Sequence, residues 1–161
     1  MNNKLIIVTD LGLLKAYRLE TTPRGTPRLG PIEQVRLEEA HRRLLDEVAD
    51  LAGRHVSPTQ HKWGAPMADD HNLRLELRHR LIKQIARHTT RLARESGCDG
   101  VWLVAHKEIG RPILDELPAP VRRRVEKTIP RDLVKAGQRE LLQALKPHVS
   151  RGQPVNREES V

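Results

Sequence analysis

Residues 97–105 read GCDGVWLVA, and they give the clearest indication of the architecture of this chain. Turn residues lead into a continuous, uncharged apolar run at 101–105 that is bounded by Gly and contains β-branched residues. Such a run is typical of a strand that is buried on both faces of a sheet. Patterns with helical spacing precede and follow it, so the sequence predicts a central strand within an α/β alternation.

The N-terminal region predicts a meander of three strands. Residues 4–10 form an apolar run, residues 14–19 alternate apolar with polar side chains, and residues 32–37 alternate loosely. Residues 21–31 hold three Pro and two Gly, which predicts a loop. The first strand is expected inside the sheet, because its apolar run is continuous.

Two helices are expected next, with a long irregular segment between them. Apolar residues recur at helical spacing over 38–52. Residues 53–72 contain two Gly, two Pro and three His, and a structureless loop of that length is usually functional or disordered. We expect Asp69, Asp70 or Asn72 to cap the second helix, which runs to about Ser96 and ends at Gly97.

The second helix is predicted to have one apolar and one cationic face. The apolar face contains Leu81, Ile82, Ile85, Thr89, Leu92 and Ala93, and the opposite face contains Arg80, Lys83, Arg87, Arg91 and Arg94. Like charges at these steps destabilise a helix, and only Glu76 stands near them, so we interpret this basic stripe as either a phosphate-binding or a solvated face. Arg74 and Arg78 lie on the apolar side, so the start of the helix is expected to project beyond the core.

The C-terminal region predicts a short helix at 107–117 interrupted by Gly-Arg-Pro, a last strand at 125–129, and a final helix at 136–145 stopped by Pro147. We expect one domain over residues 1–147 and a disordered tail over 148–161. A second basic cluster either extends the phosphate-binding surface or is solvated. Its members are Arg122, Arg123, Arg124, Lys127 and Arg131.

Composition limits the class of protein. The net charge is +8 and the pI is near 10.2, which favours polyanionic partners, although simple solubility is the alternative. The N-terminal apolar run is too short for a signal peptide or a membrane span, so we expect a cytoplasmic protein that does not enter membranes. Cys98 is the only cysteine, which excludes an internal disulfide. Its expected role is that of a small apolar residue beside a strand.

Residues 101–145 (VWLVAHKEIGRPILDELPAPVRRRVEKTIPRDLVKAGQRELLQAL) resemble the C-terminal half of the bacterial host attachment proteins. The matching positions include Ala105, Ile109-Gly110, Ile113-Leu114, Leu117, Val121 and Arg131-Asp132-Leu133. Residues 4–20 resemble the opening hairpin of that family, and residues 50–54 (DLAGR) are similar to its Asp-x-x-Gly-Arg stretch.

The host attachment family is in turn similar to the middle domain of archaeal and eukaryotic release factors and of Pelota. That resemblance implies a mixed sheet of about five strands packed with helices. It also implies the ribosome, rRNA or tRNA as partners.

Release factors carry a Gly-Gly-Gln loop before the long helix, at a place that corresponds to residues 53–72. Here Gln60 follows Pro58-Thr59 without flanking glycines, so we expect no catalysis, with Gln60 as the one weak candidate. The residues of this segment expected to make contacts are Arg54, Gln60, His61, Lys62 and Trp63.

No metal or other cofactor is expected. The histidines His55, His61 and His71 with Asp69 and Asp70 lack a recognised ligand spacing.

Three functions therefore stay open. The first is a non-catalytic module that binds ribosomal RNA or tRNA in translation rescue, termination or hibernation. The second is a host attachment factor that acts through protein partners. The third is a divergent peptidyl-tRNA hydrolase that uses Gln60.

Overall fold

The computed structural model describes residues 3–38, 40 and 66–150 of the 161-residue chain. Five strands form one mixed sheet in the order β3-β2-β1-β4-β5. The strands are β1 (Lys4–Thr9), β2 (Leu13–Thr21), β3 (Pro27–Arg36), β4 (Gly100–Val104) and β5 (Val125–Ile129). The first three pair antiparallel, whereas β4 is parallel to both β1 and β5. The predicted α/β class and five-stranded mixed sheet are confirmed.

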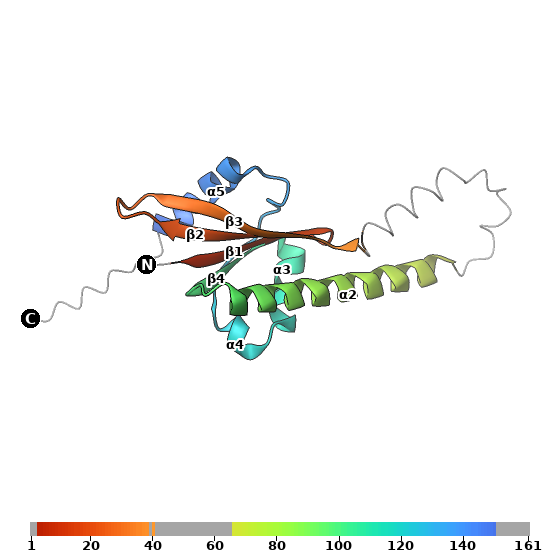
Figure 1. Ribbon diagram of the computed structural model, residues 1–161. Helices are drawn as coiled ribbons and strands as arrows, with labels where there is room; N and C mark the ends of the chain where they lie inside the picture. The colour runs from red at the N-terminus through yellow and green to blue at the C-terminus, as the bar shows by residue number, and fades with distance from the viewer. Residues whose placement is uncertain (1–2, 39, 41–65, 151–161) are drawn as a thin grey trace, which may run out of the picture.

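Strand β4 is buried along its whole length, as expected, but the centre of the sheet is β1. The described helices cover both faces of the sheet (Figure 1). They are α2 (Pro66–Glu95), α3 (Lys107–Glu116) and α4 (Ala119–Arg122) on one face and α5 (Gln138–Ser150) on the other. Because side chains alternate along a strand, Leu5 and Ile7 enter the α2-side core, whereas Ile6 and Val8 enter the α5-side core.

Two predicted core residues lie where the sequence indicated. Trp102 is 3% exposed in the α5-side core, and Cys98 is buried in the α2-side core. The predicted loop over residues 21–31 is wrong in its second half, because β3 already begins at Pro27. Proline is tolerated there since β3 is an edge strand, where a missing N–H on the outer side breaks no ladder bond.

Helix α2 begins at Pro66, so the predicted cap at Asp69, Asp70 or Asn72 is wrong. Proline suits the first turn of a helix because its missing N–H would have no intrahelical partner there. The predicted apolar face is buried, and the helix ends as predicted before Gly97, which has a φ of +65°. Residues 71–76 are exposed on all sides, which confirms that the start of α2 projects beyond the core (Figure 1).

Helix α3 is continuous, so the predicted Gly-Arg-Pro interruption is wrong. Pro112 lies inside α3 and cannot donate the helical hydrogen bond to the carbonyl of Glu108. Arg78 of α2 replaces that donor, with its Nη2 atom 2.8 Å from the Glu108 oxygen. This bond fastens the middle of α2 to the first turn of α3.

Helix α5 starts at Gln138 rather than at residue 136, and it continues through Pro147 to Ser150. Pro147 has no N–H to donate to the carbonyl of Gln143, four residues earlier. Because Gln143 is exposed, water can donate to that carbonyl instead. Of the helix predicted over 38–52, Glu38 and Ala40 are helical. The rest of that helix, residues 53–65 of the predicted irregular segment and residues 151–161 of the predicted tail lie outside the described residues. Residues 66–72 of that segment and residues 148–150 of the tail are helical, so both predictions are wrong there.

Candidate nucleic-acid interface

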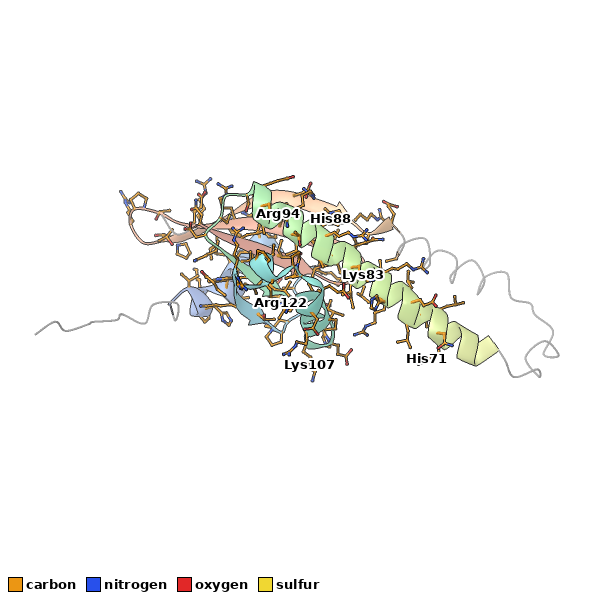
Figure 2. All side chains as sticks on the ribbon, turned by 90° about the horizontal axis from the view of Figure 1, so that it is seen from below. His71, Lys83, His88, Arg94, Lys107 and Arg122 are labelled. Carbon is orange, nitrogen blue, oxygen red and sulfur yellow. The ribbon has the colours of Figure 1, made fainter. Side chains whose placement is uncertain are left out.

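An open groove of about 690 Å³ runs between the outer face of α2 and the junction of α3 with α4. It is lined by Lys83, Ala86, Arg87, Thr90, Arg91, Arg94, Glu95, Glu116 and Pro118. Four of the five cations predicted for the basic stripe therefore share one concave surface. Arg80 is exposed one turn before the groove and does not line it. Figure 2 shows Lys83 and Arg94 along α2, with the α3 and α4 region beside it.

Lys83, Arg87 and Arg94 are exposed and form no ion pair with any of the described residues. Lys83 and Arg87 stand one turn apart, and Arg87 and Arg94 two turns apart, on the same helix face. Like charges at these spacings repel one another. We call these three residues the groove cations. An external anion bound along them would relieve their mutual repulsion.

Arg91 differs from the groove cations because it already has acidic partners. Its Nη2 atom lies 2.5 Å from Oε2 of Glu33 on β3, and its Nη1 atom lies 3.4 Å from Oε2 of Glu95. The hydrogen bond to Glu33 is the main cause that raises the pKa of the Arg91 guanidinium. The expectation that only Glu76 stands near the stripe is wrong.

His88 lies beside this ion pair, with Nδ1 3.4 Å from Nη2 of Arg91. Burial lowers the pKa of the His88 imidazole from 6.5, the positive charge of Arg91 lowers it further, and Glu33 partly opposes both. His88 is therefore mainly neutral at pH 7 and adds little to the positive charge of this face.

The floor of the groove is apolar. Ala86 is 4% exposed, and the Thr90 hydroxyl donates to the Ala86 carbonyl at 2.7 Å, so it is committed to the helix backbone. Pro118 is exposed on the opposite wall, next to Glu116, whose carboxylate lies 3.6 Å from Nε2 of His79. The groove thus combines a cationic rim and an apolar floor with a wall on which Pro118 stands beside the carboxylate of Glu116.

Three members of the second basic cluster make structural contacts, and two of them, Arg122 and Lys127, line one open pocket of about 300 Å³. Arg122 donates to the carbonyls of Leu114, Asp115 and Leu117 at 3.0, 3.3 and 3.0 Å, which caps the C-terminus of α3. Arg124 donates to the carbonyl of Ala93 at 2.7 Å and to that of Cys98. Both side chains are therefore occupied in holding the fold together.

Lys127 lies 4.6 Å from the centre of the Trp102 ring, and it donates to the His148 carbonyl of α5. Arg123 and Arg131 are exposed. The contribution of all these residues to RNA binding stays a prediction, and the geometry favours Arg123 and Arg131 over the three that hold structural contacts.

Glu126 on β5 joins the N-terminal strand to this region. Its carboxylate accepts from Lys4 Nζ at 2.6 Å and from the indole N–H of Trp102 at 3.2 Å. Burial alone would raise the pKa of this carboxyl, but the bonds from Lys4 and Trp102 outweigh burial and hold it below 4.5. The ionised form of Glu126 is therefore the form that the fold stabilises.

The predicted contact residues Arg54, Gln60, His61, Lys62 and Trp63 lie outside the described residues, and the weak catalytic candidate Gln60 is one of them. Within residues 3–38, 40 and 66–150 the structure brings together no group of three side chains suited to hold a metal ion. None of the helices in the described ranges is long and apolar enough to cross a membrane.

Sequence reasoning missed the groove residues Glu95, Glu116 and Pro118, and it also missed Glu33, the ion-pair partner of Arg91. Glu95 stands four residues after Arg91, so helical spacing alone could have revealed that pair. Glu33 meets Arg91 across 58 positions of sequence, through the placement of β3 beside α2. No local pattern signals such a contact.

The fold and groove define a mixed α/β protein with a cationic surface on its longest described helix. Residues 5–145 match the family described as "Protein required for attachment to host cells", and the chain belongs to that family. No curated protein matches the sequence. A solved structure described as an archaeal protein is similar, with 11% identity and a TM-score of 0.43 over 89% of this chain and 33% of that one. The chain thus spans about a third of the length of that archaeal protein.

Proposed function

We propose that this protein is a non-catalytic RNA-binding module that acts on the ribosome or on tRNA. The observation that carries the proposal is the row of three groove cations, which have no ion-pair partner among the described residues and line one open groove. The resemblance of the sequence to host attachment proteins, and of that family to release-factor middle domains, supports the same surroundings.

Phosphate binding accounts for the energetics of this surface. Ordinary exposed helix faces interleave acids with bases, which gains about 0.2–0.5 kcal/mol per pair spaced three or four residues apart. The groove cations lack these stabilising pairs, and the phosphates of an RNA backbone would provide the missing negative charge. Their binding would also release condensed counterions from the RNA. Binding by this route has to weaken steeply as salt rises.

Sedimentation of the tagged protein with cell lysate on sucrose gradients tests the proposal. The wild type is expected to comigrate with ribosomal particles at low salt and to leave them at high salt. The variant K83Q/R87Q/R94Q should stay at the top of the gradient. A matched variant, K135Q/R139Q/K146Q, removes three exposed cations of the α5 side and should behave as the wild type. A wild type that remains at the top at low salt refutes the ribosomal role.

A protein partner is the second candidate, and one observation favours it. Leu73 and Leu75 are 41% and 51% exposed on the projecting part of α2. The two leucines stand two positions apart and so point in different directions from the helix, and each offers a separate apolar contact to another protein. This function predicts that a protein copurifies after nuclease treatment and that L73S/L75S releases it, whereas K83Q/R87Q/R94Q does not.

Peptidyl-tRNA hydrolysis through Gln60 is the third proposal, and it stands on the release-factor resemblance alone. Gln60→Ala should abolish turnover of peptidyl-tRNA and spare its binding. Turnover that is unchanged in Q60A removes this function.

A further inference from the structure

The groove offers two kinds of surface to one ligand. Lys83, Arg87 and Arg94 stand on the α2 side, whereas Pro118 stands exposed on the opposite wall and Ala86 lies beneath. A ligand that fills it presents negative charge to the α2 side and an apolar surface to Pro118, and it keeps its charges away from the carboxylates of Glu95 and Glu116, which also line the groove. The groove volume of about 690 Å³ lies within the range of small-ligand sites, roughly 300–1,000 Å³.

The row of cations matches a chain of phosphates better than a single one. Lys83 and Arg94 are separated by eleven positions, which corresponds to about 16 Å along a helix at 1.5 Å per residue. One phosphate spans a fraction of that length. The ligand therefore carries its charges in series, as a nucleic-acid strand does.

A duplex presents its phosphates and sugars outward and keeps its bases stacked inside, so it would engage the cationic rim and leave the apolar wall uncovered. A single strand can place phosphates on the rim and turn its ribose and base edges toward Ala86 and Pro118. Removal of the exposed Pro118 surface from water then adds to the electrostatic attraction.

We infer that the groove takes a single-stranded RNA segment, with phosphates on Lys83, Arg87 and Arg94 and bases or riboses against Pro118 and the floor. This inference rests on the proposed RNA-binding function and adds the form of the RNA to it. Arg91 contributes to the rim to the extent that a phosphate displaces Glu33, with which it now pairs at 2.5 Å.

Fluorescence anisotropy with one labelled RNA oligonucleotide, single-stranded or annealed to its complement, tests the inference at fixed salt. The single strand is expected to bind at least about fivefold more tightly, since covering about 40 Å² of apolar surface gives that ratio at about 25 cal/mol per Å². Pro118→Ser should weaken the single strand toward the duplex and leave duplex binding unchanged. K83Q/R87Q/R94Q should weaken both forms.

The outcomes separate this inference from the proposed function. Duplex binding as tight as single-strand binding, or a single-strand affinity unchanged in P118S, overturns the inference while RNA binding stands. Poly-glutamate that competes as well as the single strand at equal charge assigns the groove to an acidic protein segment instead. Absence of binding to either RNA form overturns the proposed function together with the inference. Thermal melting of P118S verifies that the variant is folded.

Discussion

Three consecutive arginines, Arg122, Arg123 and Arg124, are expected to differ sharply in their effect on stability. Arg124 is half-buried and bonds to the carbonyls of Ala93 and Cys98, at the place where α2 ends and β4 approaches. The Ala93 carbonyl lies in the last turn of α2, where no helical N–H can reach it. Arg124→Met keeps the apolar stem of the side chain and removes both donors.

The expected cost follows from the type of bond that is lost. A hydrogen bond from a charged group contributes about 1.5–3 kcal/mol, and the partial exposure of Arg124 places its two bonds together at about 2–4 kcal/mol. Arg122 is exposed, so R122M should cost about 1 kcal/mol despite its three carbonyl contacts. R123M should change the free energy of unfolding by less than about 0.5 kcal/mol, because Arg123 is a surface cation.

Urea denaturation followed by tryptophan fluorescence measures this series. The midpoint should fall most for R124M, with the dependence on urea concentration unchanged, and R123M serves as the charge-matched control. Equal midpoints for R123M and R124M would refute the structural role of Arg124. The second basic cluster would then be available as a whole for phosphates.

Further perturbations follow from other contacts. Arg78→Met should lower the free energy of unfolding by about 1 kcal/mol in the wild type and by less in a P112A background. The reason is that an alanine at position 112 would supply the N–H that the Glu108 carbonyl lacks. Equal losses in the two backgrounds of this double-mutant cycle would contradict the role of Arg78. Because the folded state lowers the pKa of Glu126, the stability from its bond to Lys4 is present above pH 4.5 and is lost as pH falls below that value. Glu126→Gln should therefore reduce stability at pH 7 and flatten the decline in acid, and parallel pH profiles would refute this coupling.

Much of the fold follows from local pattern. The continuous apolar runs of β1 and β4, the alternation in β2 and the 3.6-residue period of α2 each have one structural solution that buries them. The face of α2 that enters the core and the face that carries the cations were both predictable, since periodicity fixes both together. The strand at Val125–Ile129 was predicted at the positions that it occupies.

The errors arose where proline was interpreted without its tertiary setting. Pro27 lies at the sheet edge, Pro112 is compensated by Arg78, and Pro147 sits near the exposed end of α5. A proline normally costs the hydrogen bond that its missing N–H would make. The edge position of Pro27, the Arg78 side chain near Pro112 and solvent near Pro147 each remove that cost.

The candidate site was predictable only in part. Helical spacing placed the cations on one face, but it could not show that Glu33 neutralises Arg91 or that Pro118 closes the groove. Both contacts depend on how β3 and the α3–α4 junction sit beside α2. Charge density along the chain also could not show that Arg122, Arg124 and Lys127 hold structural contacts, because hydrogen bonds to carbonyl oxygens leave no trace in composition.

The salt dependence of RNA affinity shows whether the cations of α2 bind phosphates. Binding of a single-stranded RNA is measured against salt concentration for the wild type, K83Q/R87Q/R94Q and K135Q/R139Q/K146Q. Each lost phosphate contact lowers the slope of log affinity against log salt by about 0.7, so the groove variant should lose about 2 units of slope and the α5-side variant close to none. Equal losses in the two variants, or none in either, would contradict the assignment of the phosphate site to the groove on α2.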